Sequence, residues 1–174
     1  MGGLIRGTAS SSRFMRQLRA FRISDRRFPI FDGTGASITG GRWNSPGTAV
    51  IYAAETFAGA LLEVLAHSNM NRIPRTHTCI EITVPDGIAA EEALIDTVPG
   101  WQDEDQQASR AFGDLWLKEA RTAVLLVPSL VTQGRERNIL INPLHPDAAR
   151  ISASEPGEVQ WDERLFSGAG RKPR

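Results

Sequence analysis

Residues 40–63, GGRWNSPGTAVIYAAETFAGALLE, constrain the fold more than any other part of this 174-residue chain. Gly40 and Gly41, and then Pro46 and Gly47, are typical of tight turns. Residues 48–53 are apolar and rich in β-branched side chains, which predicts a buried strand. Residues 56–68 predict a helix, because apolar residues recur at helical spacing. The stripe they form contains Phe57, Leu61, Val64, Leu65 and Ser68.

This segment carries three side chains of different chemistry on three successive pieces of structure. Arg42 follows the first turn, Tyr52 lies in the strand and Glu63 lies on the helix. A turn of this kind also points backbone N–H groups outward, which helps to hold an anion. A cation, an aromatic ring and an anion brought to one corner suit an anionic ligand that also carries a planar cationic ring.

The remaining patterns predict a single α+β domain. Strands are expected over residues 16–24, 48–53, 77–84, 123–127 and 138–142, with a short last strand within 159–166. Residues 28–41 predict a loop, and residues 104–121 an amphipathic helix with Ala108, Phe112, Leu115 and Trp116 facing inward. We therefore expect five or six strands in small mixed or antiparallel sheets, flanked by two main helices.

Length and composition favour a globular protein of the cytoplasm. Hydrophobic residues make up 41% of the chain, yet no apolar run is long enough to span a bilayer, and the N-terminus lacks the apolar core of a signal peptide. Cys79 is the single cysteine, which excludes a disulfide framework and a cysteine metal cluster. The domain is expected over residues 16–166, between a flexible leader (1–15), whose first residues could stem from cloning, and a disordered tail (167–174).

The charges balance but are unevenly spread along the chain. Residues 1–50 are rich in arginine, residues 76–120 are acidic, and Lys118 and Lys172 are the only lysines. The planar arginine fork binds phosphates through two points. Two interpretations stay open for the basic third: a solvated face, or a non-catalytic module that binds nucleic acid or a partner. Zero net charge disfavours direct contact with nucleic acid.

Glu63 has an ordinary explanation beside a functional one. It could be a solvated carboxylate at a helix edge, but no Lys or Arg lies three or four residues away to pair with it. Gly59, one turn earlier, weakens a helix and often marks a close approach by another group. Glu63 and His67 have the spacing of two metal ligands, but His77 and His145 show no matching spacing. No metal site is therefore expected.

The other candidates also have structural alternatives. Arg42 could pair with Asp32 or cap backbone carbonyls. Tyr52 could be a core residue with a satisfied hydroxyl group. Ser129, after an apolar strand and a proline, could simply cap a turn, and His145 is better explained as structural. Individually these residues decide little.

Their order along the chain resembles the RES domain, which takes its name from an arginine, a glutamate and a serine. The resemblance lies in FRISDRRFPIFDGTGASITGGRWNSPGTAVIYAAETFAGALLEVLAH, followed by HTCIEITVPD, LLVPS and NILINPLHP, and covers nearly all of residues 18–151. The three naming residues match Arg42, Glu63 and Ser129. The resemblance implies a fold like the ADP-ribosyltransferases and a toxin that consumes NAD without a metal. It also implies an Xre-type helix-turn-helix antitoxin that covers the active site.

On this resemblance, Glu63 is the central catalytic residue. Cleavage of the nicotinamide–ribose bond of NAD builds positive charge on the sugar, much as glycoside cleavage does. A carboxylate beside that sugar favours the transition state over the ground state. Tyr52 would stack on the nicotinamide ring while the ring is cationic. His67 would be a neighbour of Glu63 that changes charge near neutral pH.

The resemblance also implies residues that bind the substrate. Arg42 would hold the pyrophosphate or the nicotinamide-side phosphate. Arg22, on the first strand, is a second candidate for dinucleotide binding. Ser129 would form a hydrogen bond to a ribose or amide group.

Two departures from related transferases leave the acceptor open. Arginine-specific transferases carry Gln or Glu two residues before the catalytic glutamate, where this chain has Leu61. The histidine that opens the diphtheria-toxin motif has no clear counterpart, since the first strand offers Arg22. Water, phosphate or an unusual protein side chain could therefore accept ADP-ribose, which leaves a glycohydrolase, a phosphorylase or an ADP-ribosyltransferase.

Overall fold

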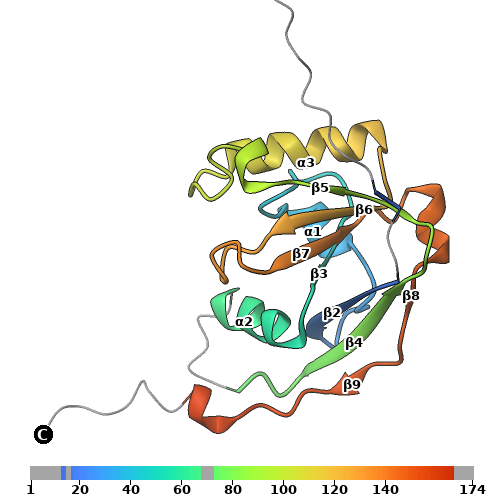
Figure 1. Cartoon of the computed structure of the whole chain (residues 1–174). Helices are drawn as coiled ribbons and strands as arrows, with labels where there is room; N and C mark the ends of the chain where they lie inside the picture. Colours follow the sequence, from blue (N-terminus) through green and yellow to red (C-terminus); the bar gives the residue numbers. More distant parts are fainter. Residues whose placement is uncertain (1–12, 15–16, 68–72, 167–174) are drawn as a thin grey trace, which may run out of the picture.

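The computed structural model describes residues 13–14, 17–67 and 73–166, and these form one mixed α+β domain. The strands are β1 (Arg13–Phe14), β2 (Leu18–Asp25), β3 (Ile51–Ala54), β4 (His77–Val84), β5 (Ala89–Glu92), β6 (Val124–Pro128), β7 (Arg137–Ile141), β8 (Ser152–Ala153) and β9 (Gly157–Glu158). The helices are α1 (Thr34–Thr39), α2 (Phe57–His67) and α3 (Gln107–Glu119), with short 3-10 turns at Ile95–Thr97, Pro146–Arg150 and Glu163–Leu165. Figure 1 shows α2 and α3 on either side of β6 and β7.

The strands form one mixed sheet that bends sharply in its middle. Their order is β1-β5-β6-β7-β3-β2-β4-β8, with β9 also pairing with β4. All neighbours pair antiparallel except β5 and β6. Strands β2 and β3 pair only at Phe21 and Ala54, whereas β2 and β4 pair along eight positions. The sheet therefore has two halves joined by one residue pair, and Figure 1 shows β2 and β4 diverging from β6 and β7.

The two halves pack against each other through the largest apolar cluster. Ala20, Ile80 and Ile82 from the β2–β4 half contact the face of the other half that carries Ile51 and Ile139. Strand residues alternate between faces, so one face of each half is buried in this cluster. Burial of an isoleucine side chain is worth about 1.5–3 kcal/mol, so this interface contributes strongly to the stability of the fold.

Helix α3 packs on the opposite face of the β3–β7–β6 half, while α2 packs against β2 and β3. Trp116 of α3 clusters with Leu125 and Leu140, while Ala60 of α2 clusters with Ala54 and Ile23. Tyr52 and Asn138 point to this same face, because Tyr52 is opposite Leu140 in the register and Asn138 is opposite Ala54. The region between the two helices is therefore where polar residues of β3 and β7 can meet residues of α2.

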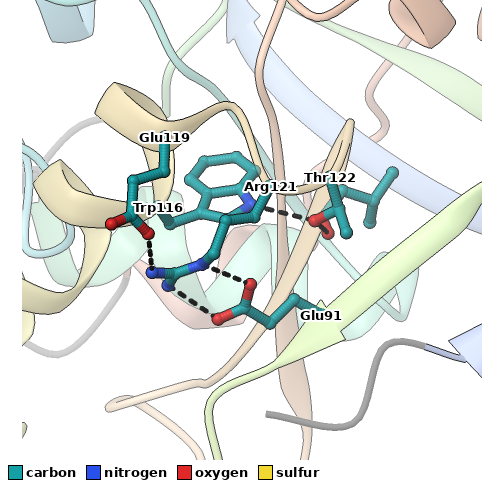
Figure 2. A network of polar contacts seen from close by, with 6 residues as sticks. Glu91, Trp116, Glu119, Arg121 and Thr122 are labelled. Carbon is teal, nitrogen blue, oxygen red and sulfur yellow. Dashed lines mark hydrogen bonds and ion pairs between the residues drawn. The ribbon is translucent and has the colours of Figure 1, made fainter. Parts of the chain in front are cut away.

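A buried ion pair fixes the end of α3 to the sheet. Arg121 donates two hydrogen bonds of 2.8 Å to the carboxylate of Glu91, which is 2% exposed, and one of 2.8 Å to Glu119. Next to this pair, the indole of Trp116 donates to Thr122 Oγ1 at 2.9 Å, as Figure 2 shows. A buried carboxylate is stable only when paired and hydrogen-bonded, so Arg121 is the residue that allows Glu91 to be buried.

The predicted fold class is confirmed, with differences at the level of single elements. Strands β2, β3, β4, β6 and β7 and helices α2 and α3 lie where the sequence places them. Four short strands were missed: β1, β5, β8 and β9. The strand expected within 159–166 is wrong, because that segment contains a 3-10 turn and the C-terminal pairings come earlier, in β8 and β9. The predicted loop 28–41 contains the short helix α1.

One side-chain prediction needs correction. Leu115 is 47% exposed rather than inward, because α3 packs through Ser109, Gly113, Trp116 and Leu117, a stripe that excludes it. On the predicted apolar stripe of α2, Phe57 is 40% exposed and packs edge-on against Phe21.

Some expectations lie outside the described residues. These are residues 1–12 and 15 of the leader, the tail, Ser68 and the first residue of the strand predicted over 16–24. Residues 13–14 of the predicted leader are described and form β1, which pairs with β5. Within the described ranges, no helix is long and apolar enough to cross a bilayer, and no group of three or more His, Cys, Asp or Glu side chains is arranged to hold a metal ion.

Candidate active site

The carboxylate of Glu63 is held by two donors from separate parts of the chain. Its Oε1 atom accepts hydrogen bonds from Ser129 Oγ at 3.0 Å and from Asn138 Nδ2 at 2.6 Å. Ser129 directly follows β6 and is 2% exposed, while Asn138 lies in β7. The Glu63 side chain is 23% exposed, so it is half-buried but open to a ligand. Two fixed donors give this carboxylate one preferred orientation.

The first turn of α2 explains how Glu63 reaches this position. The hydroxyl of Thr56 accepts a hydrogen bond from Gly59 N at 2.9 Å, which caps the helix. The same hydroxyl donates to Glu136 Oε2 at 2.9 Å. A Cβ atom at Gly59 would lie only 3.0 Å from that oxygen. The close approach that Gly59 predicts is therefore real, and Glu136 is the approaching group.

His67 lies beside Glu63 but at the outer edge of the site. Its Nδ1 is 2.8 Å from the backbone oxygen of Glu63 and 3.8 Å from Glu63 Oε2, and its side chain is 81% exposed. Since the ring mainly contacts solvent, His67 is a peripheral neighbour of the carboxylate.

Arg42 lies in a turn that is docked rigidly onto α3. Gly40 has a φ of 72°, as its position before a tight turn requires. The backbone oxygen of Trp43 is so close to Gly113 that a Cβ there would lie 1.8 Å from it. Asp114 of α3 accepts from Ser45 N at 2.8 Å and from Ser45 Oγ at 2.6 Å. The turn is therefore part of the scaffold.

The Arg42 guanidinium is partly engaged by the protein. Its Nη1 donates to the carbonyl oxygens of Trp101 and Asp103, both at 3.0 Å. Of the structural alternatives, carbonyl capping is the one seen, and Asp32 instead accepts from Thr34 at 2.6 Å. Both Arg42 bonds come from one nitrogen, so within the described residues Nε and Nη2 have no hydrogen-bond partner.

Tyr52 lies between the Arg42 turn and the Glu63 carboxylate. Its hydroxyl accepts from Trp43 N at 3.1 Å and donates to Asn44 Oδ1 at 2.7 Å. Burial raises the pKa of this phenol well above its ordinary value, so Tyr52 stays neutral. In the β3–β7 register Tyr52 is diagonal to Asn138 on the same face, which corresponds to about 7–8 Å. The ring, rather than the hydroxyl, is what Tyr52 can offer to a ligand.

Arg22 closes the bend of the sheet. It donates to the carbonyl oxygens of Ile30 and Tyr52, both at 2.7 Å, and to that of Asp32 at 3.4 Å. Burial lowers the pKa of its guanidinium, and the nearby Asp32 charge opposes that shift. These bonds replace strand pairing where β2 and β3 meet at one position. Arg22 therefore contacts Tyr52 through the backbone, and in the described structure no contact joins it to Glu63.

The structure thus brings Glu63, Ser129 and His67 together and connects Arg22, Tyr52 and the Arg42 turn into a second group.

Two residues of the site were missed from the sequence, Asn138 and Glu136. An asparagine that opens an apolar strand has low β propensity, which was a usable signal for the first. Glu136 stands between two arginines, which suggested a solvated charge cluster.

Comparison with known families gives one match that covers most of the chain. The RES domain matches residues 19–162. This range contains every residue of the site described above.

Two relatives extend along nearly the whole chain. A protein of Sphingobium sp. (strain YBL2) named "Prs ADP-ribosylating toxin" is 40% identical over 166 residues, which are 93% of this chain and 99% of the relative. A "Toxin Res" of Pseudomonas putida is 35% identical over 150 residues, 84% of this chain and 98% of the relative.

The fold is also found in a solved structure. A chain of the Mycobacterium tuberculosis MbcT-MbcA toxin-antitoxin complex superposes with a TM-score of 0.69, covering 85% of this chain and 87% of its own length. The two sequences are 17% identical, so this likeness supports the fold alone.

Proposed function

The chain belongs to the RES domain family, and we propose that it is the toxin of a toxin–antitoxin module that cleaves the nicotinamide–ribose bond of NAD in the cytoplasm. A relative that covers nearly all of the chain bears the name of an ADP-ribosylating toxin. ADP-ribosyl transfer uses NAD as its donor, so the same bond must break whichever acceptor follows.

The observation that carries the proposal is the state of Glu63. In the described part of the chain no Arg or Lys forms an ion pair with it, and its contacts are two neutral donors and the edge of His67. An oriented carboxylate without a resident cation can stabilise positive charge that develops on a ligand. Cleavage of the nicotinamide bond develops such charge on the ribose.

The remaining site residues have roles that suit the same substrate. The free donors of Arg42 suit a phosphate, and a guanidinium binds phosphate through two points. The neutral ring of Tyr52 suits stacking on a cationic ring. Ser129 and Asn138 hold Glu63, and the Ser129 hydroxyl can also reach a ribose or amide group. Arg22 acts through the backbone of Tyr52, which positions the ring.

The alternative of a nucleic-acid-binding module gains no support from Arg19, Arg22, Arg27 and Arg42. Arg19 is paired with Glu81 at 2.5 Å and Arg27 with Asp25 at 2.6 Å. Arg22 and Arg42 bind backbone carbonyls. These four arginines bind groups of the protein itself, so they do not form a free basic stripe for nucleic acid.

We further propose that an antitoxin of the Xre type covers the face between α2 and the Arg42 turn. A toxin that acts on a shared cofactor has to be silenced at rest, and this face holds the substrate-binding groups. A complex of toxin and antitoxin that still released nicotinamide at the rate of the free toxin would contradict this part.

The test is a nicotinamide-release assay with purified protein and NAD. We expect Glu63→Gln to lower turnover by about 10²- to 10³-fold, the typical loss for one preorganised electrostatic group. Glu155→Gln, at an exposed position after β8, is the matched control and should turn over like the unmodified protein. Equal turnover by the two variants, with equal melting temperatures, would refute the proposal.

A further inference from the structure

A second carboxylate faces the same stretch of α2 as Glu63. Gly59 and Glu63 are four residues apart on the helix, so they lie on one face, about 5–6 Å apart at Cβ. Glu136 Oε2 lies 3.0 Å from the position of a Cβ at Gly59. The two carboxylates therefore stand one helical turn apart along the same helix face.

Glu136 is fixed in place by the segments that hold Glu63. Its backbone oxygen accepts from Ser129 N at 3.0 Å, and its backbone N–H donates to Thr132 Oγ1 at 3.1 Å. Its side chain accepts from Thr56 Oγ1 at 2.9 Å. Asn138, the second donor to Glu63, is two residues further along and points to the same side as Glu136. Glu136 thus belongs to the framework of the site.

The charge of Glu136 is not neutralised by its arginine neighbours. Arg137 donates to Glu55 and Glu92, and Arg135 donates to Gln133 at 2.8 Å. No ion pair in the described ranges uses Glu136. Glu136 is half-buried, with a single neutral donor, Thr56, on its carboxylate. Within the described ranges, its other carboxylate oxygen has no hydrogen-bond donor.

We infer that Glu136 is the base on the acceptor side of the reaction and that the acceptor is a hydroxyl or amine group rather than phosphate. The inference rests on the proposed function. As the C1′–N bond of NAD breaks, its electron pair leaves with nicotinamide. The acceptor oxygen or nitrogen bonds to C1′, and its proton passes to the Glu136 carboxylate and then to solvent.

Charge explains the choice of acceptor. Two carboxylates one helical turn apart repel an incoming anion, and they do so more strongly in a site with little water than in bulk solvent. A neutral hydroxyl or a cationic amine meets no such barrier. Both must lose a proton to become linked to ribose, and a base within hydrogen-bond reach removes it. Inorganic phosphate is an anion, so the two carboxylates repel it, and a base gives it no comparable help.

The experiment measures products formed from NAD by the full chain in three arms: methanol as a hydroxyl acceptor, inorganic phosphate, and sodium azide. Azide is an anionic nucleophile that has no proton to lose. The variants are Glu136→Gln, which keeps an acceptor oxygen for Thr56, Glu63→Gln, and Glu155→Gln as the control. Melting temperatures verify that each variant is folded.

We expect Glu136→Gln to lose about 10²-fold or more in hydrolysis and methyl ADP-ribose formation, the usual contribution of a general base. Azide should restore nicotinamide release by at least about 10-fold in Glu136→Gln, with ADP-ribosyl azide as the product, because azide needs no base and the variant lacks the repelling charge. Azide should not restore Glu63→Gln, whose lost carboxylate acts on the sugar.

Three results would overturn the inference while leaving the proposed function intact. They are unchanged turnover in Glu136→Gln, a loss that azide does not relieve, and ADP-ribose phosphate as the main product of the unmodified protein. If the unmodified protein releases no nicotinamide in any arm, the proposed function itself fails.

Discussion

Removal of the Asn138 side-chain amide isolates the part of catalysis that comes from orienting Glu63. In the structure Asn138 Nδ2 lies 2.6 Å from Glu63 Oε1, and Ser129 Oγ donates to the same oxygen at 3.0 Å. Asn138→Ala deletes one of these two donors. The backbone pairing of Asn138 with Ala54 and Val127 involves main-chain atoms and is retained.

The magnitude follows from the kind of hydrogen bond that is lost. A bond to a charged group is worth about 1.5–3 kcal/mol, which is about 10- to 150-fold in rate if the bond is fully used in the transition state. Because Ser129 still holds the carboxylate, we expect the lower part of this range, about 10- to 30-fold. The loss should be in kcat, since the amide orients a group that acts on developing charge.

The assay is steady-state nicotinamide release over a range of NAD concentrations, with a thermal melt of each protein. Asn138→Asp is the informative companion, because it has the same shape but replaces the donor with a second negative oxygen. It should be at least as impaired as Asn138→Ala. Unchanged kcat with a raised KM would show that Asn138 contacts the substrate and does not orient Glu63. A variant with full activity would refute the reasoning.

Three further outcomes test the framework around the site. Gly59→Ala should gain none of the roughly 1 kcal/mol that alanine normally adds to a helix, because the new Cβ displaces Glu136. The same displacement should lower NAD turnover. A variant that is more stable in denaturant melts and fully active in turnover assays would contradict this. Arg121→Met should cost about 3–5 kcal/mol in chemical denaturation, since it leaves the buried Glu91 charge unpaired. The hydrogen-bonded Arg137 lowers the pKa of Glu55 in the folded protein. This pair therefore stabilises the fold above the pKa of an unfolded glutamate, about 4.3, and its contribution is lost as pH falls from there through the lowered pKa. Arg137→Gln should reduce this acid sensitivity of the melting temperature between pH 3 and 6.

The sequence predicted those parts of the fold that have a strong local pattern. The strands that became β4, β6 and β7 are apolar or alternate cleanly, and each was placed within a residue or so of its observed ends. Strand β5 has the sequence AAEE, which has low β propensity, and it forms because it pairs in parallel with β6. Such a strand is dictated by its partner, so its own residues do not reveal it.

The site divides in the same way. Glu63 and Ser129 were singled out by family resemblance and not by spacing, and in the structure a hydrogen bond joins them across 66 positions of sequence. Asn138 and Glu136 depend on the register of β7, which decides that they face α2 while Arg137 faces Glu55 and Glu92. Register is a property of the assembled sheet, and no pattern local to these residues contains it.

Two glycines show why this site is built to be rigid. Each stands in a helix, where glycine costs about 1 kcal/mol relative to alanine. Gly59 lets α2 approach Glu136, and Gly113 lets α3 approach the backbone oxygen of Trp43, next to Arg42. One contact fixes the carboxylate end of the site and the other fixes the arginine end, with Tyr52 between them. Electrostatic catalysis is effective when charges are aligned before the substrate arrives, because no reorganisation is then needed during the reaction. The stability given up at these two positions is therefore best understood as the cost of holding Arg42 and Glu63 in place from opposite sides.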